Sequence, residues 1–138
     1  MSSHRQEHSR AMQARKLQAK AKGDITMEAK AKAIGVRISP MKVQIVLDLI
    51  RNQPADKAMA ILHHTPKAAC ECLEKLLKSA VSNAVTNHNM EESALYVKEC
   101  HVGPGAHMLK RMRAMDHGKG YRILKRTSNI TIVVGEKE

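Results

Sequence analysis

Aromatic residues are almost absent from this 138-residue chain, which has no Phe, no Trp and only two Tyr, Tyr96 and Tyr121. Proteins that read single-stranded nucleic acid usually stack the bases on aromatic side chains, so we do not expect sequence-specific reading of splayed-out bases. Acidic residues are also scarce, because 13 Asp and Glu oppose 24 Lys and Arg, for a net charge of +11. Such an excess indicates a polyanionic partner, either nucleic acid or, less often, an anionic membrane.

Long apolar runs and a cysteine framework are missing as well. No run approaches the roughly 18 apolar residues of a membrane helix, and the N-terminus lacks the apolar segment of a signal peptide. The three cysteines are an odd number without framework spacing, which suits a reducing compartment. We therefore expect a soluble, intracellular protein with no membrane partner.

Groups that could bind a metal or perform catalysis are present but poorly arranged. Three short pairings suggest metal ligands: His63-His64, Cys70-x-Cys72 and Cys100-His101. Positions 70 and 72 lie about 200° apart on a helix, so those two thiols cannot share one tetrahedral ion. The adjacent Glu91 and Glu92 suit acid–base catalysis poorly, and there is no Gly-rich phosphate loop. We predict no enzyme activity, no metal site, no cofactor and no small-molecule substrate.

Charge is distributed unevenly along the chain. Residues 1–32 carry a net +5, residues 33–100 carry +1 and residues 101–138 carry +5. The first 24 residues have too few large apolar side chains to fold alone, so we expect residues 1–26 to form a basic extension and residues 27–138 to form one domain. The extension could be a solvated tail, an RNA-binding arm or an organellar transit peptide.

The body of the domain reads as one strand followed by three helices. The strand is predicted over 27–38, with Ala33, Ile34, Val36 and Ile38 supplying apolar contacts. Helices are predicted over 40–51 after an N-cap at Ser39, over 55–63, and over 66–87 after an N-cap at Thr65. Their expected core residues are Val43, Val46, Leu47 and Ile50, then Ala58, Ile61 and Leu62, then Ala69, Cys72, Leu73, Leu76, Leu77, Ala80 and Ala84.

The last third of the chain reads as a long hairpin within 103–130. Strands are predicted over 95–102 and 106–113, with a bend at 103–105, and a return arm over 121–134. Ile130, Ile132 and Val134 alternate with other residues, so that part of the ribbon should lie against the helices. Alternation fails over 106–113 and 121–127, which places these arms outside the core. About ten residues at 3.3 Å each give a projection of roughly 30 Å.

The two arms hold six cations and no acid: Lys110, Arg111, Arg113, Arg122, Lys125 and Arg126. An isolated two-stranded ribbon is marginally stable in water, so one this long should be held by contacts elsewhere. Adjacent cations put charge on both faces of the ribbon. RNA folded around the arms could neutralise both faces, whereas a flat membrane could neutralise only one.

The chain resembles the universal large-subunit ribosomal protein 22 family. The matching segments are RISPMKVQIVLDLIR (37–51), HTPKAACECLEKLLKSAVSNAVTNH (64–88), LYVKE (95–99), LKRMR (109–113) and YRILKRTSNITIVV (121–134). The resemblance implies an α+β fold, in which three helices pack on a small antiparallel sheet and a long β-hairpin protrudes. It also implies a structural role in the large ribosomal subunit of the cytoplasm or an organelle, with large-subunit rRNA and neighbouring ribosomal proteins as partners, assistance in assembly, and a hairpin lining the nascent-polypeptide tunnel.

The resemblance assigns the candidate sites by position. Implied rRNA-binding residues are Arg37, Lys42, Lys119 and the six cations of the arms. The tip departs from the usual family pattern, Pro-Arg-Ala-Arg (or Lys)-Gly-Arg-Ala, because Ala114, Met115, Asp116, His117, Gly118, Lys119 and Gly120 stand there. We therefore expect Met115, Asp116, His117 and Gly118 to face the tunnel interior and a nascent polypeptide.

A winged-helix DNA-binding regulator is the alternative, since three helices followed by a hairpin is the order of that fold. The helix that would read DNA, 66–87, is charge-balanced, and the hairpin is too long for a wing.

Overall fold

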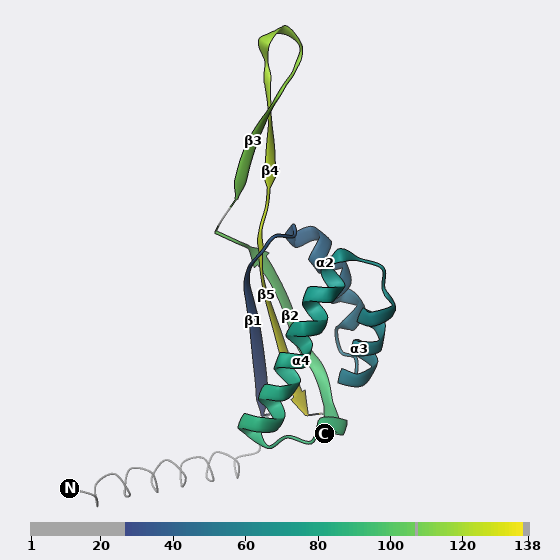
Figure 1. The fold of residues 1–138 in the computed structure, drawn as a ribbon. Coiled ribbons are helices and arrows are strands. Elements are labelled where there is room, and N and C mark those ends of the chain that lie inside the picture. Colours follow the sequence, from purple (N-terminus) through teal and green to yellow (C-terminus); the bar gives the residue numbers. More distant parts are fainter. Residues whose placement is uncertain (1–26, 107, 137–138) are drawn as a thin grey trace, which may run out of the picture.

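A computed structural model describes residues 27–106 and 108–136, and shows three helices with two antiparallel sheets (Figure 1). The elements in chain order are β1 (Glu28–Val36), α2 (Pro40–Ile50), α3 (Ala55–His64), α4 (Ala68–His88), the 3₁₀ turn η1 (Glu92–Ala94), β2 (Leu95–Pro104), β3 (Leu109–Ala114), the 3₁₀ turn η2 (Asp116–Gly118), β4 (Gly120–Lys125) and β5 (Ser128–Glu136). The α+β fold expected from the sequence is confirmed. Among the helices so described, none has the length and apolar character of a membrane span.

The core lies between the helices and one face of the three-stranded sheet β1-β5-β2 (Figure 1). β5 is the central strand, and its Ile130, Ile132 and Val134 are at most 1% exposed. The three predicted inward positions of β5 are therefore confirmed, although strict alternation stops at Ile132 because Val133 and Gly135 are also buried. The α2 stripe is confirmed too, because the side chains of Val43, Val46, Leu47 and Ile50 are buried. Fully burying one side chain of this size contributes about 1.5–3 kcal/mol.

The apolar contacts predicted for the first strand were partly wrong. Ala29 and Ala31 are buried, whereas Ile34 is 80% exposed. Since successive side chains of a strand point to opposite faces, the buried alanines put position 34 on the solvent face. The pairing of β1 with β5 shifts between Ala33 and Val36, and Gly35 has φ +72° there. This irregularity precedes the turn into α2.

The start of the longest helix was also predicted wrongly. α4 begins at Ala68, and its N-cap Lys67 makes no side-chain cap hydrogen bond. Thr65 instead ends α3, because its hydroxyl donates to the Ile61 carbonyl at 2.6 Å. Since α4 begins three residues after Thr65 and has Lys67 as its N-cap, Thr65 does not occupy the capping position.

Two of the expected core positions on α3 and α4 differ from the structure. Cys70 is 5% exposed and belongs to the core, whereas Cys72 is half-buried. Cys70 shares a stripe with Leu73 and Leu77, three and seven residues later, which is the helical repeat of a buried face. Ile61 is also half-buried and packs at the margin of the core.

The hairpin projects from the end of the body (Figure 1). β3 and β4 form a separate two-stranded sheet, and every β3 side chain is exposed. Ile123 is half-buried, while the other β4 residues are exposed. The expectation that these arms lie outside the core is confirmed, although the strands are shorter than predicted.

Candidate RNA-binding interface

Each charged rung of the hairpin stem pairs one cation with one uncharged side chain. The pairs are Leu109 with Lys125, Lys110 with Leu124, Arg111 with Ile123, Met112 with Arg122, and Arg113 with Tyr121. Opposed residues of an antiparallel ribbon lie on one face with Cβ atoms about 4.5–5.5 Å apart, so like charges placed opposite each other are destabilising. In this register no cation of β3 faces a cation of β4. The ribbon therefore concentrates positive charge without direct cross-strand repulsion.

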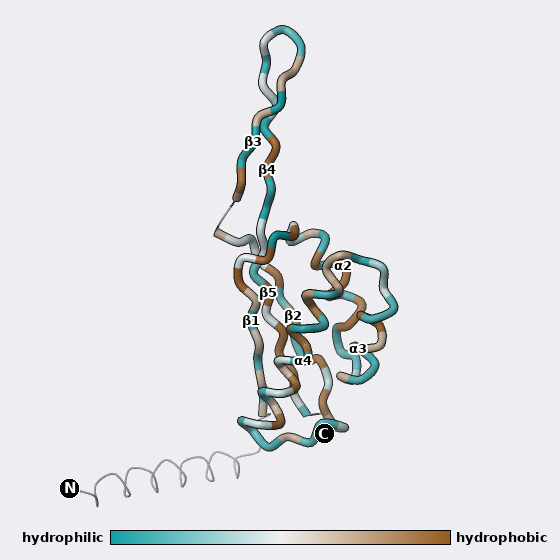
Figure 2. Tube along the Cα trace, in the orientation of Figure 1, coloured by the Kyte–Doolittle hydropathy of each residue, from teal (hydrophilic) through white to brown (hydrophobic). Residues whose placement is uncertain are grey.

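Both faces of the ribbon carry exposed cations. Alternate residues point to opposite faces, which puts Arg111, Arg113 and Lys125 on one face, and Lys110 and Arg122 on the other. β3 and β4 contain no Asp or Glu. Figure 2 shows polar and apolar colours mixed along the stem. Each face can thus form ionic contacts and apolar contacts at once.

The far end of the hairpin is a tight turn around residues 115–119. The Met115 amide donates to the Lys119 carbonyl at 2.8 Å, and the Lys119 amide donates to the Asp116 carbonyl at 3.3 Å. His117 and Gly118 both have positive φ, at +56° and +71°. All five residues are exposed. The residues predicted for the tunnel tip therefore form the turn farthest from the body, and Lys119 lies at its return side.

A basic groove lies where the hairpin meets the body, at the start of α2. Its volume is about 760 Å³, and its lining includes Arg37, Lys42, Lys125 and Arg126. None of the described residues lining this groove is acidic. The N-terminal end of a helix adds a partial positive charge, and Ser39 is the α2 N-cap at this wall. The structure thus places Arg37, which precedes α2, and Lys42, in its first turn, along the same groove as two cations of the hairpin.

We call the groove that Arg37, Lys42, Lys125 and Arg126 line the root groove. The sequence did not predict it. Arg37 and Lys42 were implied by the family resemblance, and Lys125 and Arg126 by the charge of the arm. Nothing in the sequence signals that residues more than 80 positions apart line one groove, because their proximity depends on the pairing of β1 with β5. A groove lined by four cations is suited to binding closely spaced anionic groups such as phosphates.

Sequence analysis also missed the contacts that join the hairpin to the sheet. The Gly105 amide donates to the Thr127 carbonyl at 2.8 Å, which continues strand pairing past the end of β2. A Cβ on Gly105 would lie 3.0 Å from Thr127 Cβ, closer than ordinary contact. Beside this join, the Gly35 amide donates to Asn129 Oδ1 at 2.9 Å. We call these four residues the neck, and they hold the ribbon in line with the sheet.

The short His and Cys pairings that suggested metal ligands do not come together with one another in the described structure. Within 27–106 and 108–136, no three His, Cys, Asp or Glu side chains gather in a way that could hold an ion. Cys70 and Cys100 are both buried. The Cys100 thiol donates to the Leu47 carbonyl at 3.6 Å, so it has a structural contact in the core.

Comparison with known proteins agrees with this geometry. A family model described as ribosomal protein L22p/L17e matches residues 29–135. The large ribosomal subunit protein uL22 of Clostridium perfringens is 58% identical over 111 residues, which are 80% of this chain and 99% of that protein. The uL22 of Clostridium acetobutylicum is 50% identical over 112 residues, 81% of this chain and 100% of that protein.

A more distant relative gives the same result. The uL22 of Oceanobacillus iheyensis is 49% identical over 112 residues, covering 81% of this chain and 98% of that protein. The family match gives the winged-helix alternative no support. From its first strand to its last, the chain therefore belongs to the ribosomal protein L22p/L17e family.

Proposed function

We propose that this protein binds large-subunit rRNA through its hairpin stem and root groove, and thereby helps the rRNA to fold during assembly. Family membership makes it a structural protein of the ribosome, in the cytoplasm. The observation that supports the finer proposal is a ribbon that carries cations on both faces and pairs with no other strand of the described chain.

The geometry favours RNA over other polyanions. The stem has two charged faces, so a partner that satisfies it must surround it, and folded RNA offers phosphates on several sides. The apolar residue opposite each cation could pack on ribose or base surfaces after the phosphates fix the register. The root groove would hold the same RNA where the ribbon meets the body, because Lys125 and Arg126 belong to the arm and line the groove.

The tip is proposed to face the tunnel interior and the nascent polypeptide. Its seven positions, 114–120, include one cation, Lys119, and one acid, Asp116, and so carry no net charge with His117 neutral. A neutral turn at the end of a cationic stem is poorly suited to phosphates and better suited to a passing chain. Contacts with neighbouring ribosomal proteins would fall to the body.

The rRNA proposal is tested by changing Lys110, Arg111, Arg122 and Arg126 to Ala in the full chain. Binding to an rRNA fragment that surrounds the hairpin should weaken. The plot of log K against log salt has a negative slope, and each lost phosphate contact should make that slope shallower by about 0.7–0.9. The matched control changes Lys57, Lys67, Lys75 and Lys78, which removes the same charge from α3, α4 and the residue before α4. Equal salt slopes for both variants would contradict the assignment to the hairpin.

The tip proposal has a separate test in assembled ribosomes that hold a stalled nascent chain. Photoreactive groups at positions 115–117 should form adducts with the nascent polypeptide. The same groups at positions 110 and 122 of the stem should form adducts with rRNA. Adducts from 115–117 that are mainly with rRNA, and none with the nascent chain, would argue against a tunnel-facing tip.

A further inference from the structure

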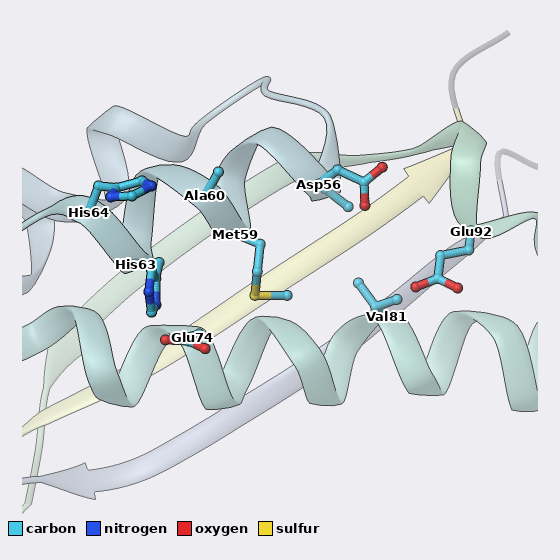
Figure 3. A pocket seen from close by; sticks show the side chains of 9 residues that line it. Asp56, Met59, Ala60, His63, His64, Glu74, Val81 and Glu92 are labelled. Carbon is cyan, nitrogen blue, oxygen red and sulfur yellow. The ribbon is translucent and has the colours of Figure 1, made fainter.

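A second groove lies on the body between α3 and α4, and its charge is opposite to that of the root groove (Figure 3). Its volume is about 420 Å³. Asp56 and Glu92 stand at one end of the groove, and Glu74 stands at the other, beside His63 (Figure 3). None of the described residues that line it is Lys or Arg, which is unexpected in a chain with net charge +11. We call it the acidic groove.

The middle of the acidic groove is apolar. Met59 from α3 and Val81 from α4 lie between the two acidic ends (Figure 3). Both side chains are half-buried, so part of each is open to a ligand. Glu74 also pairs with Lys78 at 2.7 Å, but Lys78 is not part of the lining. The groove therefore suits a segment that presents one large apolar side chain with cations on both sides of it.

The extension 1–26 has this pattern. It carries six basic and two acidic residues, a net +4, and few large apolar side chains. Leu17 is preceded by Arg15 and Lys16 and is followed by Lys20. The described relatives match 111 or 112 residues that are 98–100% of their own length, and the family model begins at residue 29. The extension thus lies outside the part of the chain that the family model and these relatives match.

The chain enters the body beside the last turns of α4, on the face of that helix turned away from the acidic groove. The start of β1 lies beside the last turns of α4, where Asn83 donates to the Lys30 carbonyl at 3.3 Å. Glu28, Asn87 and His88 line one small pocket at that place. Along α4 at 1.5 Å per residue, Glu74 is about 20 Å from Asn87. The ten-residue separation of Leu17 from Met27 can span about 33 Å, which exceeds the path around α4, a helix about 10 Å across, into the groove.

We propose that the extension docks in the acidic groove of its own body, with Leu17 against Met59 and Val81 and the flanking cations at the acidic ends. The occupant is this segment because its charge complements the groove, its tether is long enough, and it leads into β1 beside the end of α4. In the free protein, docking would withdraw the cations around Leu17 from non-specific nucleic-acid contacts.

The test uses the free, full-length protein, without RNA, so its result does not depend on the rRNA proposal. Trypsin should cleave after Arg15, Lys16 and Lys20 at least about fivefold more slowly in the full chain than in the isolated peptide 1–26, because cleavage requires the undocked state. The groove variant Asp56→Asn/Glu74→Gln/Glu92→Gln should restore the rate of the peptide.

The matched control is Asp48→Asn/Glu71→Gln/Glu99→Gln, which removes three exposed carboxylates outside the groove. It should keep the slow cleavage. Cleavage at the peptide rate in the unmodified chain, or slow cleavage that survives in the groove variant, would overturn the proposal. Urea unfolding of each variant checks that its body is folded.

A photoreactive benzophenone amino acid in place of Leu17 gives an independent readout in the unmodified groove. Adducts should map to α3 and α4 at the apolar middle of the acidic groove. Adducts confined to other surfaces of the body, or only between two molecules, would overturn docking in cis.

Discussion

β4 and β5 follow one another in the chain, yet their side chains lie in different surroundings. β4 has no fully buried residue, while β5 buries Ile130, Ile132 and Val134 against the helices. Both strands pair antiparallel, β4 with β3 alone and β5 with β1 and β2, and burial of one face of the larger sheet produces the pattern of buried residues in β5. Its absence in β4 shows that neither face of the stem is fully covered by the part of the chain that the structure describes, 27–106 and 108–136. Mutations in each region can test this difference in burial between the sheet and the stem.

The largest effect is expected from removing the stem. Replacing residues 108–126 by a short Gly-Ser turn should change the free energy of unfolding by no more than about 1 kcal/mol, because the described stem buries little against the body. The truncated protein should incorporate poorly into large subunits. Urea unfolding and quantitative mass spectrometry of salt-washed subunits measure the two results. Normal incorporation would show that the stem is not the main anchor.

Single apolar truncations should separate the two regions by stability. Ile132→Ala removes a side chain that is 0% exposed and should lower the free energy of unfolding by about 2–5 kcal/mol. Ile123→Ala in the stem should lower it by less than about 0.5 kcal/mol. Urea unfolding followed by circular dichroism measures both. Similar losses at the two positions would mean that the stem unfolds cooperatively with the core.

The neck should respond to a single methyl group. Gly105→Ala places a Cβ 3.1 Å from the backbone carbonyl carbon of Thr127, and should cost about 1–3 kcal/mol through local backbone movement. Gly103→Ala is the matched control, since nothing lies within 4 Å of its Cβ. Amide hydrogen exchange at 105, 106 and 126–128 should increase in the first variant only.

The smallest expected effect is on pH dependence, and it concerns the body. Hydrogen bonds from Lys75 and Lys78 hold the pKa of Glu71 and Glu74 below the ordinary value of 4.5. A lowered folded-state pKa gives stability that is complete above pH 4.5 and is lost as the pH falls through the folded value. The urea midpoint should therefore decline slightly between pH 5 and 3. Glu71→Gln/Glu74→Gln should reduce that decline.

Local patterns were sufficient to predict some of these features from the sequence. The stripe of α2, the alternation of β5 and the loss of alternation in the stem each depend on neighbours within a few residues. The ion pairs Glu71–Lys75 and Glu74–Lys78 are local in the same sense, because each joins residues four positions apart on one helix face.

Features that depend on distant contacts were not predicted. Gly35 donates to Asn129, 94 positions away, so no local signal could place the neck. The root groove requires the β1–β5 register, and the acidic groove requires the packing of α3 on α4. The start of α4 was misplaced because Thr65 could cap the next helix or end the previous one, and the structure puts it at the end of α3 with Lys67 as the α4 N-cap.

The cross-strand pairs of the stem also favour one alignment of β3 with β4 over its neighbours. Sliding β4 by two residues in one direction would oppose Lys110 to Arg122 and Arg113 to Lys119. Sliding it the other way would oppose Lys110 to Arg126 and Arg111 to Lys125. The observed register has no such pair, and each like-charge pair costs a few tenths of a kcal/mol or more. A ribbon that buries neither face is thus kept in alignment by repulsion among its misaligned forms, and salt should weaken that selection.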